Sequence, residues 1–301
     1  MPAIRHFEQI AERILSQPLR KRLAVVCATD VATIEAVVLA LRQELVDVVF
    51  VGESRRTQAF GQLAPFASRI SYVEASQPEE AARLAVGLIR RGQADILMKG
   101  LINTDKLLRA ILSKQEGLLP AGNVLSHVAA FDIPGRDRLL FLTDAAVIPY
   151  PTLAQRREQI RYAAGVCRAF GIDVPRVALV HCSEHESPHF PHTLDYGVLK
   201  AEAAAGAWGD IVVDGPLDVL TACSLEALQT KGIDSPLQGE ADALLCPDIE
   251  TGNALYKALP LFAHARPAGM LVGAACPVVL PSRGDTQTSK YYSIAMAALT
   301  A

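Results

Sequence analysis

Short runs of aliphatic and β-branched residues recur along the whole chain, separated by longer stretches whose apolar positions have helical spacing. Runs that are apolar at nearly every position are typical of strands buried on both faces of a parallel sheet. The runs predicted as buried strands are 23–27, 46–51, 70–73, 95–98, 139–142, 177–180, 211–213, 243–245 and 270–272. Alternation of such strands with helices predicts an α/β fold with largely parallel sheets.

The segments between these strands contain helix-start signals. In one of them, Ser76 and Glu79 have the spacing of a capping box, and Pro78 stands where the first helical turn accepts proline. Residues 1–19 combine helically spaced apolar positions with charges, which predicts an amphipathic surface helix rather than a signal peptide. The longest apolar stretch, 268–280, is short for a membrane span and contains a proline. We therefore expect a cytoplasmic protein that does not enter a membrane.

Composition narrows the function classes. A chain of 301 residues with 50% hydrophobic content can bury one large or two medium cores, and a prior of roughly 150 residues per domain favours two domains. The formal net charge of −3 argues against nucleic-acid and anionic-membrane partners, which attract basic surfaces. Six widely spaced cysteines without a CxxC pair predict neither a disulfide framework nor a cysteine zinc site, so we expect reduced thiols.

One stretch imitates a metal site. His185–His189 matches the HExxH pattern of zinc proteases, which requires both histidines on one helical face. Pro188 within that turn would remove a hydrogen bond and clash with the preceding turn. The ligand-type residues of 181–192 therefore favour an exposed loop after a strand over a metal centre. We predict no metal site.

Polar residues follow several predicted strands. No GxGxxG or P-loop pattern is present, but Lys99-Gly100, Thr143-Asp144, Asp214–Pro216 and Asp248 fall at strand ends. In open α/β sheets ligands bind at the carboxyl ends of strands. Each pair by itself also fits a turn or a helix cap, so their joint placement is what favours a binding site.

A second group of polar residues lies close together near the C-terminus. Ser282, Arg283, Gly284 and Asp285 offer a hydroxyl, a forked cation, a flexible backbone and a carboxylate. Such groups can bind phosphate and stabilise an oxyanion, and a positive pocket raises the thiolate fraction of a thiol. Alternatively, these residues have no chemical role and simply precede a helix, with Ser282 or Asp285 as its N-cap.

Four segments together carry a family resemblance. The chain resembles the phosphate acetyltransferase and phosphate butyryltransferase family from about residue 20 to its end. The segments that carry this resemblance are 98–104, 125–127, 252–257 and 280–285. That family moves an acyl group between coenzyme A and inorganic phosphate. The resemblance implies two α/β domains facing across a cleft, an isocitrate/isopropylmalate dehydrogenase-like architecture. Residues 1–122 and 270–301 would form the first domain and 123–269 the second.

The resemblance also implies the site. Ser282 would hydrogen-bond the sulfur, Arg283 would neutralise the carbonyl and phosphoryl oxygens, and Arg109 would bind phosphate. An aspartate that follows the serine by seven residues in the acetyltransferase branch is here Ser289, so we assign the general base to Asp285. Alternatively, Ser282 and Arg283 lower the thiol pKa without a dedicated base. The substrate-binding residues implied are Lys99, Gly100, Asn103, Thr104, Arg109, Ser126, His127, Thr143, Asp144, Asp248, Asn253, Tyr256 and Lys257.

The predicted reaction is acyl-CoA plus phosphate to acyl phosphate plus coenzyme A, reversibly, with a butyryl or acetyl group. We expect no metal or nicotinamide cofactor, small-molecule substrates as partners, and a homodimer or larger homo-oligomer. A non-catalytic acyl-CoA-binding or regulatory protein is one alternative, because the usual base is missing. A decarboxylating dehydrogenase of similar fold is another, but it needs clustered metal-binding aspartates that the sequence lacks.

Overall fold

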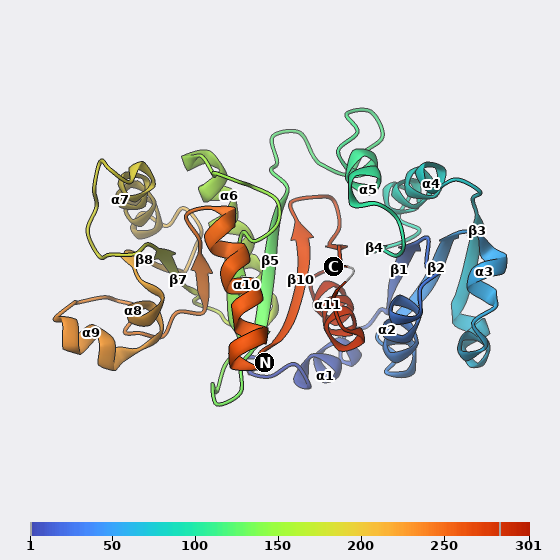
Figure 1. Ribbon diagram of the computed structural model, residues 1–301, viewed down its shortest axis with the longest axis horizontal. Helices are drawn as coiled ribbons and strands as arrows, with labels where there is room; N and C mark the ends of the chain where they lie inside the picture. The colour runs from blue at the N-terminus through green and yellow to red at the C-terminus, as the bar shows by residue number, and fades with distance from the viewer. Residues whose placement is uncertain (1, 283) are drawn as a thin grey trace. The chain divides into compact units, whose positions relative to one another are not determined.

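A computed structural model of the chain describes residues 2–282 and 284–301 (Figure 1). Arg283, assigned to catalysis above, lies outside the described residues. The chain forms two compact units. The flanking unit comprises Phe7–Leu125 and Ala268–Ala301, and the central unit comprises Ser126–Pro267 with the chain up to His6. The predicted α/β class with mostly parallel strands is confirmed.

In the flanking unit the strand order is β3-β2-β1-β4-β11-β10. Neighbours from β3 to β11 run parallel, whereas β10 and β11 are antiparallel. The strands are β1 (Lys21–Val26), β2 (Val46–Gly52), β3 (Ile70–Glu74), β4 (Ile96–Lys99), β10 (Arg266–Val272, whose first two residues belong to the central unit) and β11 (Val278–Val279). The apolar run of β1 is buried from Leu23 to Val26 because it lies between β2 and β4 with helices over the sheet.

Helices complete the flanking unit. They are α1 (Gln9–Leu15), α2 (Val31–Arg42), α3 (Ser54–Gln58), the 3₁₀ segment η1 (Gly61–Arg69), α4 (Pro78–Arg90), α5 (Thr104–Ile111) and α11 (Gln287–Thr300). Helices α2 and α11 pack side by side (Figure 1). The N-terminal helix predicted for residues 1–19 is present but shorter, because α1 spans only Gln9–Leu15. The predicted capping box at Ser76 is wrong: Gln77 precedes α4 without a side-chain cap bond, and Pro78 alone supplies the start signal.

In the central unit the order is β5-β6-β9-β7-β8. Strands β5 and β6 are antiparallel and the other neighbours are parallel. The elements are β5 (Ser126–Asp132), β6 (Leu140–Thr143), α6 (Leu153–Ala169), β7 (Arg176–Val180), α7 (Pro191–Ala204), β8 (Val212–Leu217), α8 (Val219–Cys223), α9 (Leu225–Lys231), β9 (Ala243–Leu245) and α10 (Ile249–Ala263). Two apolar clusters stabilise the unit, one around Leu244 and Ala178 and the other around Phe131 and Leu142.

Three predictions need correction or completion. Strands β5 and β11 were not predicted, and Asp214 to Pro216 lie inside β8 rather than in a turn after a strand. The carboxylate of Asp214 accepts a hydrogen bond from the Ser235 hydroxyl at 2.6 Å, so it serves a local contact. In the described part of the chain, no helix combines the length and the apolar character that a membrane crossing requires.

Candidate functional site

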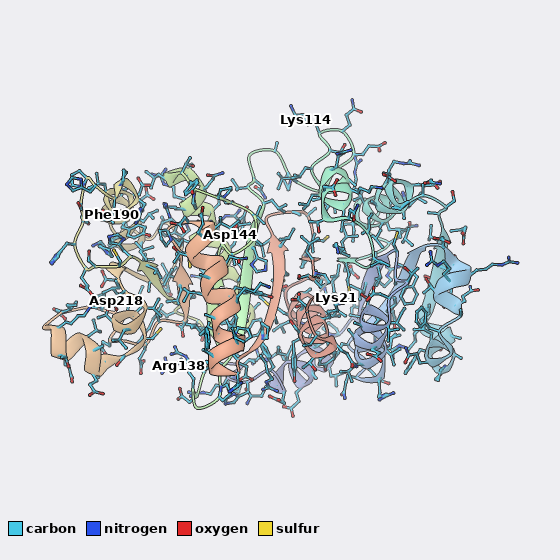
Figure 2. The ribbon with its side chains drawn as sticks, viewed as in Figure 1. Lys21, Lys114, Arg138, Asp144, Phe190 and Asp218 are labelled. Carbon is cyan, nitrogen blue, oxygen red and sulfur yellow. The ribbon has the colours of Figure 1, made fainter. Side chains whose placement is uncertain are left out.

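Asp144 organises the polar residues of the central unit. It follows β6 and is buried, with 2% of the residue exposed. Oδ2 accepts hydrogen bonds from the Ser126 hydroxyl at 2.8 Å and from the His127 backbone N–H at 3.1 Å. Oδ1 accepts from the backbone N–H groups of Ala146 at 2.7 Å and Val147 at 2.9 Å. Both oxygens are therefore engaged by protein donors, and the carboxylate ties the start of β5 to the loop after β6 (Figure 2 labels Asp144).

Helix α10 is held against this loop by its first two turns. A Cβ atom at Gly252 would lie 2.0 Å from the Asp144 carbonyl oxygen, so only glycine permits this approach. Asn253 Nδ2 donates to the Ala145 carbonyl at 3.1 Å. Asp248 caps the helix by accepting from the Thr251 N–H at 2.8 Å. The polar start of α10 is thus fixed beside the start of β5 and the end of β6.

Aromatic contacts extend the cluster along α10. The Tyr256 ring meets the edges of His127 and Phe131 at centroid distances of 5.8 Å and 5.6 Å. Lys257 Nζ lies 4.9 Å from the centroid of the same tyrosine ring, while its side chain reaches the surface. Thr143 Oγ1 is 3.4 Å from Ser126 Oγ. The eight predicted residues of this unit, from Ser126 to Lys257, therefore gather at one place, at the start of β5, the end of β6 and the start of α10.

Lys99 and Gly100 stand at the carboxyl end of β4 in the flanking unit. Lys99 is buried, and its ammonium donates to the Gly100 carbonyl at 3.4 Å. A Cβ atom at Gly100 would lie 2.5 Å from the Cys27 carbonyl oxygen, so the turn after β4 is pressed against the end of β1. Cys27 itself has a φ of 55°. Burial raises the pKa of its thiol to about 11, and the carboxylates of Glu53 and Glu79 add to the increase.

Helix α5 displays the next predicted residues. Asn103 occupies the N-cap position without a side-chain cap bond, and Thr104 is the first helical residue; both are exposed. Arg109 is also exposed and lines a pocket of about 210 Å³ with Lys106 and Glu79. Lys106 Nζ pairs with Glu79 Oε1 at 2.7 Å, which together with the charge of Arg109 lowers the pKa of the Glu79 carboxyl. This pocket carries excess positive charge and suits an anion.

Before α11, Gly284 lies in a turn, and Ser282 and Asp285 on either side are hydrogen-bonded to each other. Asp285 Oδ2 accepts from the Ser282 N–H at 2.8 Å, and the Asp285 N–H donates to the Ser282 carbonyl at 3.2 Å. Thr286, not Ser282 or Asp285, caps α11 by accepting from the Ser289 N–H at 3.1 Å. The cap alternative is therefore wrong for both residues. Ser289, at the position of the family aspartate, is 4% exposed in the first turn of α11.

Residues 181–190 of the histidine-rich segment form a loop between β7 and α7, as predicted, whereas His192 lies in the first turn of α7 and His181 is buried. Helix α7 begins at Pro191, so His185 and His189 do not share a helical face. His192 Nε2 lies 3.2 Å from His181 Nδ1. Burial, the Arg156 charge and the neighbouring His181 lower the pKa of His192 to about 4. Among the residues that the structure describes, no group of three or more His, Cys, Asp or Glu side chains is arranged to hold a metal ion.

The structure adds a residue that sequence reasoning missed. Arg156 of α6 is 3% exposed, and its Nη2 donates to the Pro247 carbonyl at 2.9 Å, directly before the α10 cap. Its Nε lies 3.6 Å from Asp195 Oδ2. Arg157, the next residue, pairs at the surface with Glu202. Only the helix packing tells these two arginines apart, so no sequence signal could have found the buried one.

Comparisons with known proteins agree across nearly the full length. Residues 69–298 match the family described as phosphate acetyl/butaryl transferase. The chain is 38% identical over 298 residues to a phosphate butyryltransferase of Clostridium beijerinckii, covering 99% of this chain and 98% of that protein. It is 38% identical over 282 residues to a phosphate acetyltransferase of Thermotoga maritima, covering 93% and 95%.

Solved structures give the same picture. A branched-chain phosphotransacylase from Enterococcus faecalis superposes with a TM-score of 0.81 at 30% identity, covering 93% of this chain and 99% of that one. A 4-hydroxythreonine-4-phosphate dehydrogenase from Burkholderia phymatum superposes with a TM-score of 0.55 at 14% identity. At that identity the second likeness concerns the fold alone.

Proposed function

Because the chain belongs to the phosphate acetyl/butaryl transferase family, we propose that it transfers a short acyl group, butyryl or acetyl, reversibly between coenzyme A and phosphate. A phosphate oxygen attacks the thioester carbonyl carbon, a C–O bond forms and the C–S bond breaks. The sulfur leaves with the electron pair and is protonated as free coenzyme A. The reverse reaction begins with the thiolate and the acyl phosphate.

The observation that carries this proposal is the contact between Gly252 and Asp144 within a full-length family match. The glycine allows the α10 motif to pack on the β6 loop, and the Asp144 carboxylate attaches that loop to the 125–127 motif. Asp144 would then act by positioning Ser126 and His127 rather than by touching substrate, because its oxygens are already bonded. Tyr256, Lys257 and Asn253 are left to face the ligand from α10.

In the flanking unit, Ser282 would donate a hydrogen bond to the sulfur, and Arg283 would neutralise the developing oxyanion. Arg109 would bind phosphate beside Lys106, with Asn103 and Thr104 at the start of the same helix. Asp285 would take the thiol proton. Its hydrogen bond from the Ser282 N–H keeps the carboxylate next to the serine that would meet the sulfur. A positive pocket around the thiol would raise the thiolate fraction further.

The finer features expected from the family belong to the same proposal. They are two domains facing across a cleft, a cytoplasmic homodimer, and turnover without a metal or nicotinamide. Light scattering on the purified protein tests the dimer. Assays with a chelator and without nicotinamide test the cofactor requirement.

Release of free thiol from acetyl-CoA and butyryl-CoA, with and without phosphate, tests the central proposal. We expect phosphate-dependent release. A binding or regulatory protein would release no thiol, and a dehydrogenase would need a nicotinamide acceptor. We further expect kcat/KM for butyryl-CoA to equal or exceed that for acetyl-CoA, since extra methylenes in an apolar pocket contribute about 1 to 3 kcal/mol each at best. A strong preference for acetyl-CoA would place the protein with the acetyltransferases.

A further inference from the structure

An ion pair with a buried cation joins helices α2 and α11 of the flanking unit. Lys290, in the first turn of α11, is 5% exposed, and its Nζ lies 3.5 Å from Asp30 Oδ1. Asp30 is the N-cap of α2, where Oδ1 also accepts from the Thr33 N–H at 2.9 Å. Among the described residues, no other acidic side chain lies within 4.0 Å of this ammonium.

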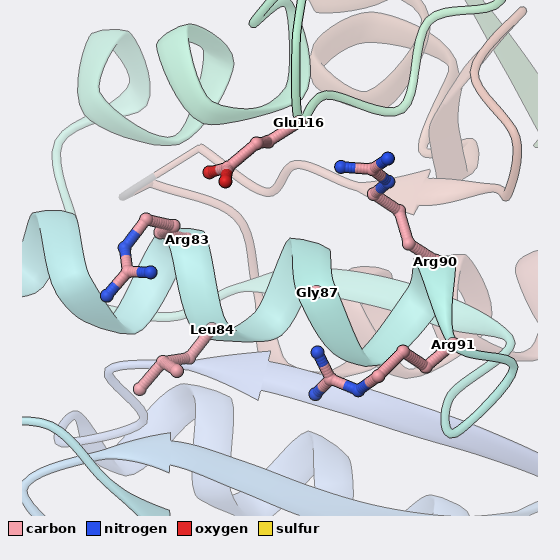
Figure 3. A pocket seen from close by; sticks show the side chains of 6 residues that line it. All are labelled: Arg83, Leu84, Gly87, Arg90, Arg91 and Glu116. Atoms are coloured by element: carbon pink, nitrogen blue, oxygen red, sulfur yellow. The ribbon is translucent and has the colours of Figure 1, made fainter.

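Burial sets Lys290 apart from other cations of this unit. Arg83, Arg90 and Arg91 of α4 are exposed around an open hollow, so water solvates their charges (Figure 3). The Lys290 ammonium has lost most of its water, which costs more than one ion pair commonly returns. Its partner Asp30 has a side chain that is itself 25% exposed, which weakens the attraction further.

The place of Lys290 in its helix adds a second cost. Helix N-termini carry partial positive charge, and the first turn of α11 contains no acidic residue to balance the ammonium. An apolar side chain of similar length would fill the same space without either cost. The lysine is therefore better explained by a role other than stability.

The lysine belongs to the helical turn that begins directly after Asp285. Thr286 is the N-cap of α11, and its carbonyl accepts from the Lys290 N–H at 3.0 Å. Asp285 precedes this cap and is hydrogen-bonded to Ser282 in both directions, at 2.8 Å and 3.2 Å. Whatever fixes Lys290 also fixes the start of α11, and with it the two residues that precede the helix.

Asp30 attaches the other end of the pair to the sheet. It follows shortly after β1, whose last residue, Val26, accepts from the Gly100 N–H of the β4 turn at 2.8 Å. Strands β1, β4 and β11 are parallel, so their carboxyl ends share one edge of the sheet. Ligands bind at this edge in open α/β sheets. The pair thus links the end of β1 to the segment that follows β11.

We propose that Asp30 and Lys290 are positioning residues for acyl transfer, which hold the first turn of α11 against the end of β1 and thereby set the place of Ser282 and Asp285. Apolar contacts permit several similar packings, whereas a buried ammonium must stay with its acceptor. Lys290 is buried, so it acts through the segment and not on the substrate. The roles of Ser282 and Asp285 rest on the proposed function, whereas the place of the segment does not.

Three variants, D30N, K290M and D30N/K290M, test the pair. Asparagine is as good an N-cap as aspartate, so D30N removes the charge and keeps the start of α2. D30N leaves the buried ammonium unpaired and should lower Tm by about 5 °C or more. The double variant should recover most of this loss, because no unpaired charge remains. The matched control is R20M/E44Q, which removes a surface pair of the same 3.5 Å length just before β1 and β2.

Hydrogen exchange measured by mass spectrometry follows the segment directly and needs no turnover. We expect peptides that cover 282–290 to exchange about tenfold faster or more in K290M and in D30N/K290M. Peptides of the central unit should exchange as in wild type, and so should every peptide of the control variant. Wild-type exchange of 282–290 in both variants would overturn the proposal.

Steady-state kinetics tests the consequence for acyl transfer. K290M and D30N/K290M should lower kcat about tenfold or more, because misplacement by about 1 Å can cost as much as 100-fold. The KM for coenzyme A should change less than about threefold, since neither residue would touch it. The double variant is decisive, because we expect it to be stable yet slow.

Two results separate the proposals from each other. If kcat and the exchange of 282–290 return to wild type in D30N/K290M together with Tm, the pair serves stability alone and the positioning role is wrong. If the wild-type protein transfers no acyl group, the proposed function fails, while hydrogen exchange still decides whether the pair holds the segment.

Discussion

Gly252 brings helix α10 so close to Asp144 that a Cβ atom at residue 252 would lie 2.0 Å from the Asp144 carbonyl oxygen. This backbone contact joins the α10 motif to the loop whose carboxylate holds Ser126 and His127. The arrangement of the central unit's polar cluster therefore depends on an absent side chain.

Gly252→Ala should force the helix or the loop to shift. We expect a loss of about 1 to 3 kcal/mol in the free energy of unfolding, the usual cost of overpacking, and a higher KM for coenzyme A. Urea denaturation and steady-state kinetics measure both. Gly165→Ala is the matched control, because Gly165 also lies in a helix and an added Cβ there meets no atom within 4 Å. The control should be neutral or stabilise by about 0.4 to 1 kcal/mol. Equal effects from the two alanines would show that the contact is unimportant.

Asp285→Asn separates the base role from the turn. Asparagine retains a carbonyl oxygen that can accept from the Ser282 N–H, so the turn should persist. If Asp285 takes the thiol proton, the reaction of coenzyme A with acyl phosphate should slow by about 100-fold to 10,000-fold. The residual rate should rise with pH toward the free thiol pKa, because only preformed thiolate reacts. Exposed Asp210→Asn serves as the control. An unchanged rate and pH profile would leave thiol activation to Ser282 and Arg283.

Arg283→Ala should lower kcat by roughly 100-fold or more, the scale of removing one oxyanion donor. Arg283→Lys should recover little of this loss, because the ammonium keeps the charge but lacks the planar fork. Arg42→Ala, at an exposed position of α2, supplies the baseline. Near wild-type kcat in the alanine variant would restrict Arg283 to a structural role.

His192 should make folding stability depend on pH. Burial and Arg156 lower its pKa from 6.5 to about 4, so the unfolded chain binds the proton more readily than the folded one. Its contribution is complete above pH 6.5 and is lost as the pH falls toward 4. After a discount for solvent screening, we expect a loss on the order of 1 kcal/mol between pH 7 and pH 5.

Denaturation of His192→Gln at both pH values measures this loss. The free energy of unfolding of the variant should change less with pH than that of wild type. Burial also lowers the pKa of His181, so this second histidine will retain part of the pH dependence. Exposed His189→Gln should behave as wild type does. If the pH dependence of stability is the same in His192→Gln as in wild type, other titratable groups cause it.

The sequence by itself determined the fold class and most strand positions. Long apolar runs such as 46–51 and 177–180 can only be buried, and their alternation with helices dictates a largely parallel sheet. Strand β5 was missed because it begins with Ser126 and His127 and ends with Asp132, although all of its residues are buried. The two-residue strand β11 is too short to leave a pattern.

The sequence also determined which residue types stand in the motifs, and hence the chemistry that they can support. Only the tertiary structure decided how they are used. Asp144 and Ser126 are 18 positions apart, and β5 and β6 pair to bring the carboxylate within 2.8 Å of the hydroxyl. Arg156 and Arg157 are adjacent in sequence, yet their side chains are 3% and 39% exposed. Hydrogen-bond partners and burial depend on distances between elements that are remote along the chain, and these distances are set by how helices and strands pack.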